Sequence, residues 1–321
     1  MPVLLTNSNK MKFLFRIALT LFFIFIILYK IDIKLVISNM SSISPIIILF
    51  TVLINIITVV DNSIKWNCLL LKHPLMDLFK LNMIGQFFSL VLPGQLMGDA
   101  SKTYIFAKGN PRAEKIATSV IVDKITGLIA VMLSGIIGMI FTHTKLPMVF
   151  IIISLTIMLS LVMGLFIIRM DFIFNKIIFT FNKIGKRKNY KFKKISEQFE
   201  RVIIAWHEYA HNPQQIFSSI LIGILYQFMG CIILMLLSHN LHINIVFFDW
   251  CWIIMVMSIA LLLPLTMAGI GVRDGTLIGL LGFLKISPDK ALSLSFSLLE
   301  IQLITAIIGG IIYLNYKSRP Q

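Results

Sequence analysis

Long runs of apolar residues are the feature that most restricts the fold of this chain. A helix needs roughly 20 mostly apolar residues to cross the hydrocarbon core of a bilayer, which is about 30 Å thick. We expect six such helices, at residues 11–29, 43–64, 117–141, 147–168, 215–238 and 291–314. With 58% hydrophobic and 13% charged residues, the chain has more apolar surface than a water-soluble core could bury. The sequence therefore predicts an all-α polytopic membrane protein whose single domain spans residues 1–321.

The first apolar run has basic neighbours, as a signal peptide does, but no small-residue cleavage site follows residues 11–29. We therefore expect it to remain as the first span.

Basic residues are concentrated in one segment, residues 169–214. Ten lysines and arginines but only four acidic residues lie between Arg169 and His211. Positive charge beside spans is typical of the cytoplasmic face, and anionic lipids attract such segments. We interpret this segment as a basic, amphipathic cytoplasmic one and assign both termini to the cytoplasm. The net charge of +15 then reflects a membrane surface, and nucleic acid is not an expected partner.

Two apolar stretches, residues 81–108 and 250–284, are interrupted by prolines and glycines. In the first stretch, the twelve residues before the break would rise about 18 Å as a helix, too little to cross the bilayer. We predict that each stretch forms a re-entrant helical hairpin. The predicted turn residues are Pro93, Gly94, Gly98, Pro264, Gly269 and Gly271. The alternative is a pair of proline-kinked helices, because membrane helices tolerate proline.

Charge distribution predicts that the two hairpins have opposite orientations. If residues 81–101 crossed the membrane, the basic segment would face outside, against the positive-inside tendency. A hairpin that returns to the cytoplasm avoids this conflict, and the second hairpin then starts from the exterior. Both stretches have the same order of features along the chain: an apolar run, a Leu-Pro pair, glycines and then an acidic residue. This order suggests an inverted repeat, an arrangement in which paired broken helices meet at a transporter's substrate site.

Charged residues in or near these apolar segments form the candidate substrate site, because charge at depth usually faces a cavity or another charge. The candidates are Asp99, Lys102, Asp123, Lys124, Arg273, Asp274 and Glu300. Asp99 and Arg273 stand where half-helices should restart, and a helix N-terminus favours phosphate or carboxylate. The alternative is a set of purely structural salt bridges. Glu300 either couples protons or hydrogen-bonds a neighbouring helix, and Asp61 with Lys65 has the i to i+4 spacing of an ion pair.

The motif "HEYAH" at residues 207–211 matches H-E-x-x-H, a pattern that can hold zinc through its two histidines. The apolar spacing of residues 192–211 indicates instead an amphipathic helix along the membrane, with both histidines on its polar side. The three cysteines do not have the spacing of metal ligands, and we expect them to form no close pair. We therefore assign them to packing in or near the bilayer. No nucleotide-binding loop is found. We expect no metal and no cofactor.

Three stretches, residues 65–108, 117–131 and 263–314, resemble the lysylphosphatidylglycerol synthase transmembrane-region family. The resemblance rests on a Pro-Gly-x-x-x-Gly-Asp motif and a Gly-x-Gly-Val-Arg-acid motif. The chain differs from the usual family pattern at Lys65, Met97, Lys102, Lys124 and Asp274. Among these, each change at a charged position keeps the sign of the charge, although lysine lacks arginine's bidentate geometry.

The resemblance implies a flippase-like protein of the prokaryotic cytoplasmic membrane, without the aminoacyl-transferase domain of bifunctional relatives, so we do not expect an enzyme. The expected function is translocation of a polar, aminoacylated or glycosylated lipid between leaflets. The alternative is a membrane component or enzyme of lipid or surface-polysaccharide assembly. Expected partners are the phospholipid or glycolipid substrate, anionic lipids, and another copy or a synthase or glycosyltransferase.

Overall fold

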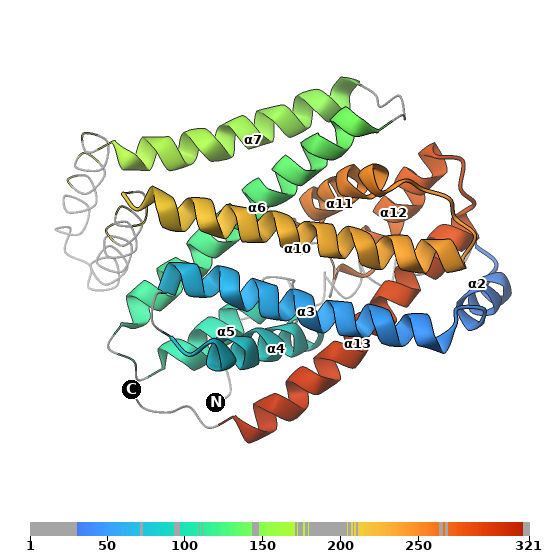
Figure 1. Ribbon diagram of the computed structural model, residues 1–321, viewed down its shortest axis with the longest axis horizontal. Helices are drawn as coiled ribbons and strands as arrows, with labels where there is room; N and C mark the ends of the chain where they lie inside the picture. Colours follow the sequence, from blue (N-terminus) through green and yellow to red (C-terminus); the bar gives the residue numbers. More distant parts are fainter. Residues whose placement is uncertain are drawn as a thin grey trace, which may run out of the picture.

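The computed structural model describes residues 31–70, 73–92, 97–108, 110, 112–142, 148–170, 172, 176, 179, 204, 207, 209, 211–262, 266 and 269–316. This part of the chain is helical and contains no strand. Its helices are α2 (Ile33–Ser41), α3 (Pro45–Leu70), α4 (Leu75–Val91), α5 (Met97–Ala107), α6 (Ala113–Phe141), α7 (Met148–Arg169), α10 (Pro213–Asn240), α11 (Phe247–Leu262), α12 (Val272–Phe283) and α13 (Pro288–Asn315) (Figure 1).

Four helices, α3, α6, α10 and α13, are long and apolar enough to cross a membrane, with 26 to 29 residues each. They coincide with four of the predicted spans. Helix α7, with 22 residues, coincides with the predicted span at 147–168. The expected span at 11–29 and most of the basic segment at 169–214 lie outside the described residues. The prediction of an all-α polytopic membrane protein is confirmed.

Two pairs of shorter helices form the predicted hairpins. Helices α4 and α5 have 17 and 11 residues, and α11 and α12 have 16 and 12. At 1.5 Å per residue, each rises less than about 26 Å and so falls short of a ~30 Å bilayer core. In Figure 1, α3 ends and α6 begins at the same side of the molecule, so the intervening α4 and α5 must return to it. Simple kinked spans are thereby excluded.

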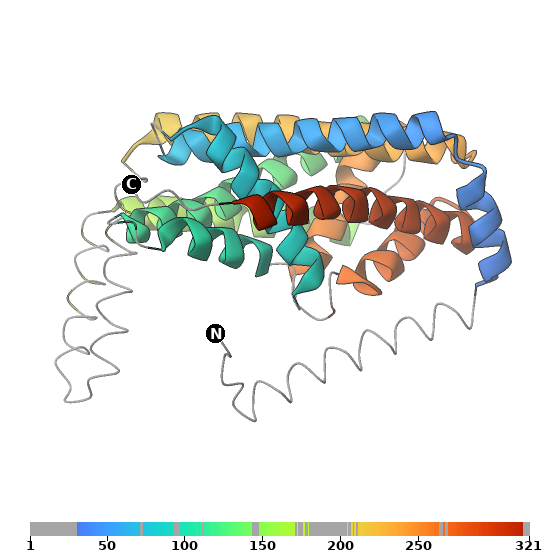
Figure 2. The same ribbon diagram turned by 90° about the horizontal axis from the view of Figure 1, so that it is seen from below.

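The second hairpin starts from the opposite side. Figure 1 shows that α10 ends, and α13 begins, at the side away from the α4–α5 hairpin. Helices α3 and α10 lie side by side in both views and run in opposite directions (Figures 1 and 2). Each half of the fold thus has the order span, hairpin, span, with reversed orientation, as the inverted-repeat hypothesis requires.

The two halves interlock, because the first helix of each hairpin packs on the last span of the other half. Helix α4 packs against α13, and α11 packs against α6. Glycines make both contacts close. A Cβ atom placed on Gly309 would lie 2.1 Å from the Met83 carbonyl oxygen, and one on Gly138 would lie 2.5 Å from the Phe248 carbonyl oxygen. Small residues at membrane helix crossings allow backbones to approach in this way.

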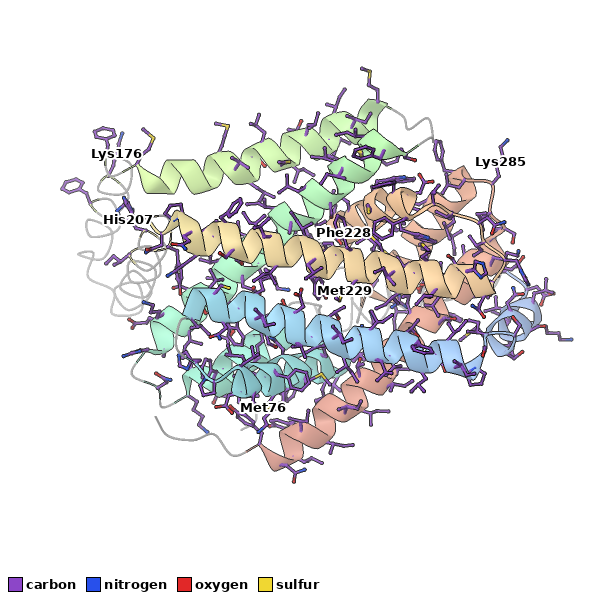
Figure 3. All side chains as sticks on the ribbon, in the orientation of Figure 1. Met76, Lys176, His207, Phe228, Met229 and Lys285 are labelled. Atoms are coloured by element: carbon purple, nitrogen blue, oxygen red, sulfur yellow. The ribbon has the colours of Figure 1, made fainter. Side chains whose placement is uncertain are left out.

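The largest buried cluster includes Trp250 and Trp252 of α11, which are both fully buried. Many leucines, isoleucines and phenylalanines of α3, α7 and α10 are instead exposed on the outer surface, as expected for a surface in contact with lipid tails. Figure 3 shows Lys176 and His207 at one end of the long helices and Lys285 at the other.

Helix α2 was not predicted. Its N-cap is Asp32, whose side chain accepts a hydrogen bond from the Lys34 backbone N–H at 2.9 Å. A helix of nine residues is too short to be recognised as an apolar span in the sequence. In the structure, α2 packs against α13 through buried Val36. It therefore forms a short cap on the bundle before α3 begins.

Candidate functional site

A cavity of about 270 Å³ lies where the two hairpins meet. Its walls come from eight helices, α3 to α6 and α10 to α13. The lining residues are Asn55, Val59, Asn62, Asn82, Gly85, Gln86, Ser89, Leu90, Gly98, Asp99, Lys102, Lys124, Tyr226, Leu261, Arg273 and Gln302. Among these described residues, three are cationic and one is acidic, so the walls have an excess of positive charge.

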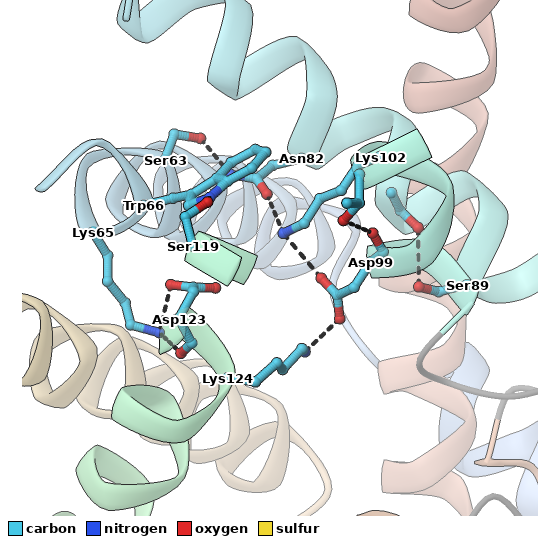
Figure 4. A network of polar contacts seen from close by, with 12 residues as sticks. Ser63, Lys65, Trp66, Asn82, Ser89, Asp99, Lys102, Ser119, Asp123 and Lys124 are labelled. Atoms are coloured by element: carbon cyan, nitrogen blue, oxygen red, sulfur yellow. Dashed lines mark hydrogen bonds and ion pairs between the residues drawn. The ribbon is translucent and has the colours of Figure 1, made fainter. Parts of the chain in front are cut away.

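The first hairpin contributes Asp99, which lies in the first turn of α5 because that helix begins at Met97. The Asp99 carboxylate binds two ammonium groups, Lys102 Nζ at 2.9 Å and Lys124 Nζ at 2.6 Å (Figure 4). The two lysines differ in access. The side chain of Lys102 is 3% exposed, whereas that of Lys124 is 48% exposed. Lys124 is therefore the cation that a ligand in the cavity would meet most directly.

Lys102 is fixed by further contacts on its buried side. Its Nζ donates to Asn82 Oδ1 at 2.9 Å and lies 4.7 Å from the centroid of the Trp66 ring. Asn82 Nδ2 in turn donates to Ser63 Oγ, and Trp66 Nε1 donates to Ser119 Oγ, both at 2.9 Å. These contacts connect α3, α4, α5 and α6 (Figure 4), so they hold the floor of the cavity rigid.

The second hairpin contributes Arg273, at the start of α12. Its Nη1 donates to Gln302 Oε1 at 3.1 Å, and its Nε and Nη2 lie 3.3 and 3.2 Å from Asp274 Oδ1. Asp274 also accepts from the Gly271 backbone N–H at 2.9 Å and from Ser295 Oγ. Asp274 therefore caps α12 and orients Arg273. It is 1% exposed and does not line the cavity.

Glycines shape the tips of the hairpins in two ways. Gly269 and Gly271 have φ angles of 74° and 89°, a region in which other residues are strained, and they turn the chain into α12 as predicted. Gly98 was predicted as a turn residue, and this was wrong because it lies inside α5. A Cβ there would lie 2.3 Å from the Gly85 carbonyl oxygen, so Gly98 serves close packing on α4. Pro93, Gly94 and Pro264 lie outside the described residues.

Besides Asp274, two predicted site residues are absent from the cavity lining, Asp123 and Glu300. Asp123 pairs with Lys65, whose Nζ lies 3.0 Å from Asp123 Oδ1 and donates to the Asp123 carbonyl oxygen at 2.8 Å. The expected ion pair of Lys65 with Asp61 is therefore wrong, because the Lys65 ammonium group binds Asp123 on α6 instead. Glu300 is half-buried on α13 and is absent from the cavity lining, whereas Gln302, two residues further along the helix, lines it.

Sequence reasoning missed the uncharged polar part of the site. Carboxamides and a phenol line the cavity at Asn55, Asn62, Asn82, Gln86, Tyr226 and Gln302. Most of them are single polar residues within apolar helices, although Asn62 stands between Asp61 and Ser63, so the sequence offers no pattern that distinguishes them. Together they surround a bound group with hydrogen-bond donors and acceptors.

The other polar motifs lie elsewhere. His211 Nδ1 lies 3.0 Å from the His207 carbonyl oxygen, and the two rings stack edge to face. Within the described part of the chain, no three His, Cys, Asp or Glu side chains are grouped as metal ligands would be. Cys231 and Cys251, expected to form no close pair, lie with their Sγ atoms 3.6 Å apart between α10 and α11.

The fold and the cavity define a polytopic membrane domain built on two opposed re-entrant hairpins. The profile of the family described as "Lysylphosphatidylglycerol synthase TM region" matches residues 13–310. The chain therefore belongs to this family, as its motifs indicated. Comparison with curated proteins and with solved structures gave no match.

Proposed function

We propose that this protein moves a lipid with a phosphate-containing, hydrogen-bonding headgroup between the leaflets of a membrane. The observation that supports this best is that two hairpins, starting from opposite sides, line one cavity with cations and carboxamides. In secondary transporters, paired broken helices surround the substrate near the midplane in this way. Membership of a lipid-related membrane family agrees with the proposal.

The charged groups suit a phosphate. Lys124 supplies an accessible point charge, and Arg273 supplies guanidinium donors held in place by Asp274. The N-termini of α5 and α12 add the positive ends of two helix dipoles. The carboxamides that line the cavity would bind hydroxyl or amino groups of the head, while the acyl chains stay in the bilayer.

We further propose that the membrane is a prokaryotic cytoplasmic membrane and that the α3 C-terminal end faces the cytoplasm. The basic residues between α7 and α10 support this orientation. Rocking of the halves about the shared cavity would expose it to each leaflet in turn, driven by an ion gradient or by the lipid gradient itself. A synthase, a glycosyltransferase or a second copy of the chain is the proposed protein partner.

The proposal predicts that Lys124→Gln lowers the rate of lipid translocation in reconstituted liposomes at least about tenfold. A hydrogen bond to a charged group contributes roughly 1.5–3 kcal/mol, and about 1.4 kcal/mol is a factor of ten. Because Asp99 keeps Lys102 as a partner, the variant should fold. Arg273→Gln should have a similar effect. Fluorescently labelled lipids and a membrane-impermeant quencher report the rate.

Lys285→Gln is the matched control, because Lys285 is exposed at the far end of the molecule and should leave the rate unchanged. Normal transport by well-folded Lys124→Gln and Arg273→Gln variants would contradict the proposal. A new covalent lipid product without movement between leaflets would favour the enzyme alternative.

A further inference from the structure

Asp61, on α3, is a buried acid to which neither the central cavity nor the ion pairs assign a role. The residue is 7% exposed. Within the part of the chain that the structure describes, its Oδ2 atom is buried and accepts no hydrogen bond. Asp61 is absent from the cavity lining, although the next residue, Asn62, belongs to it. A buried carboxylate oxygen without a donor needs another source of stabilisation.

Lys65, one helical turn further along α3, interacts electrostatically with Asp61, but its ammonium group is bound to α6. Lys65 Nζ lies 3.0 Å from Asp123 Oδ1 and donates to the Asp123 carbonyl oxygen at 2.8 Å (Figure 4). Gly127 leaves room for this arrangement, since a Cβ atom there would lie 3.0 Å from Lys65 Nζ. One ammonium group thus serves two carboxylates, and the ion pair belongs to Asp123.

The helices packed against α3, which are α4, α6, α10 and α13, supply no second cation to Asp61. On α6, Lys124 binds Asp99 instead. Tyr226 of α10 interacts electrostatically with Asp61 and with Lys124, but its phenol group carries no positive charge. Among the described residues of α4 and α13, no charged side chain is found to interact with Asp61. An ionised Asp61 would therefore be an excess negative charge inside the helix bundle.

Protonation is the simplest way to remove this excess charge. An unpaired charge in the interior of a membrane protein is costly, and a buried carboxyl group usually becomes neutral instead. A proton needs only the carboxyl oxygen itself, whereas a sodium ion needs several oxygen atoms around it. The orphaned Oδ2 atom of Asp61 therefore suits a proton.

The charge of Asp61 is coupled to the central cavity through its neighbours. Tyr226 lines the cavity and interacts electrostatically with both Asp61 and Lys124. Asp123, which shares Lys65 with Asp61, directly precedes Lys124 on α6. An anion bound at Lys124 would add negative charge beside this cluster, so Asp61 would hold a proton more tightly. By thermodynamic reciprocity, a protonated Asp61 would favour binding of the anion.

We propose that Asp61 reversibly binds a proton and that an anion in the central cavity strengthens this binding. The proton comes from water on the side to which the cavity is open, and it converts the carboxylate to a carboxylic acid. When the cavity carries a phosphate-containing lipid to the other leaflet, the proton is released there too, and its gradient is the one that drives transport. This last step rests on the proposed function, whereas the proton site does not.

The test is carbon-13 NMR of the purified full-length protein in detergent, labelled at the aspartate side-chain carboxyl carbon. Asp61→Asn identifies the Asp61 signal, and it should fold because asparagine has the shape of a neutral aspartic acid. Asp32→Asn is the matched control, since Asp32 is exposed and asparagine also caps a helix. We expect the Asp61 signal to titrate between about pH 5 and 9, where an ordinary aspartate stays ionised. The Asp32 signal should stay constant there.

The titration is then repeated with glycerol phosphate, compared with chloride at constant ionic strength. Glycerol phosphate should raise the proton affinity of Asp61 about fivefold or more, the lower end of usual couplings between two sites. Lys124→Gln should abolish this rise, because it removes the accessible cation of the cavity. Replacement of potassium by sodium ions should leave the titration unchanged.

An Asp61 signal that stays constant over this pH range would overturn the proton site. A midpoint that moves with sodium would also overturn it, because Asp61 would then hold a metal cation. The link to the cavity is overturned if glycerol phosphate has no effect, or has the same effect in Lys124→Gln. A normal titration and a normal rise, together with no lipid translocation in liposomes, would contradict the proposed function and leave the proton site standing.

Discussion

At the scale of single residues, the buried charges divide into two kinds. Lys65 with Asp123 forms a buried pair, with side chains 6% and 5% exposed. Lys124 binds Asp99 from a position open to the cavity. Since an unpaired charge in a membrane interior is costly, the first pair holds α3 against α6, whereas the second leaves a cation available to a ligand.

We predict that Lys65→Met lowers the free energy of unfolding by about 3–5 kcal/mol, because it leaves the Asp123 carboxylate buried without its partner. The double variant Lys65→Met/Asp123→Leu should regain part of this loss, since it removes the Asp123 charge but still leaves buried Asp61 without the nearby Lys65 charge. Denaturant unfolding in detergent, followed by tryptophan fluorescence, measures both. A double variant as unstable as the single one would show that the pair is not the cause.

The environment of His73 predicts a pH dependence of stability. Burial and the Arg112 charge lower its pKa below the ordinary value of 6.5, and the Asp77 carboxylate opposes them. Below pH 6.5 the unfolded chain takes up a proton that folded His73 resists, so stability should fall as the pH drops towards the folded pKa. At pH 7.5 the effect is absent. Unfolding temperatures between pH 5 and 7.5, in phosphate-free buffer, should show a shallower slope for His73→Gln.

Sequence predicted the charged half of the central site better than the uncharged half. Asp99 and Arg273 were placed correctly at restarting helices, because prolines and glycines mark where those helices break. Lys65 was given the wrong partner, since i to i+4 spacing cannot reveal a carboxylate 58 residues away. Gln302 was missed as a lining residue because the sequence does not show whether a single amide in an apolar span faces a cavity or a neighbouring helix. Only packing shows which side chains face the cavity.

At the scale of helices, glycine positions determine how closely the hairpins approach the spans. Hairpins were predictable because a short apolar leg cannot cross a bilayer. The contacts between helices were not, because a glycine that permits a close crossing looks the same in sequence as one that faces open space. Gly309 meets the α4 backbone, whereas a Cβ on Gly279 would have no neighbour within 4 Å.

We predict that Gly309→Ala destabilises the protein by about 1–3 kcal/mol, the usual cost of overpacking. Its Cβ would lie 2.1 Å from the Met83 carbonyl oxygen, a backbone atom that cannot rotate away. Gly279→Ala should be neutral or stabilising by up to about 1 kcal/mol, because alanine favours helix over glycine. Thermal unfolding in detergent compares the two. Equal effects would mean that α4 and α13 are not in close contact.

At the scale of the whole molecule, the two hairpins fix which loops share a side of the membrane. Only α3 crosses between Lys34 and Lys115, and the second hairpin returns to the side where α10 ends, near Lys285. If the first hairpin were a full span, Lys34 and Lys115 would lie on the same side of the membrane. If the second hairpin were a full span, Lys115 and Lys285 would lie on the same side. Side-specific labelling therefore tests both hairpins together.

We predict that Cys residues introduced singly at positions 34 and 285 react with a membrane-impermeant maleimide in intact cells, whereas one at position 115 reacts only after permeabilisation. Cys68, Cys231 and Cys251 are first replaced by alanine. The expected sides follow from the basic residues between α7 and α10. Labelling of positions 34 and 115 from the same side would contradict the first hairpin, and labelling of positions 115 and 285 from the same side would contradict the second.

The interlocking of α4 with α13 and of α11 with α6 has a consequence for biosynthesis. When the ribosome has completed the first half, α4 has no α13 to pack against, and the face of α6 that will receive α11 is still open. The early half must therefore wait in the membrane, with lipid or an insertion factor covering those glycine-lined faces. Folding of this part of the chain can finish only when α13 has left the ribosome.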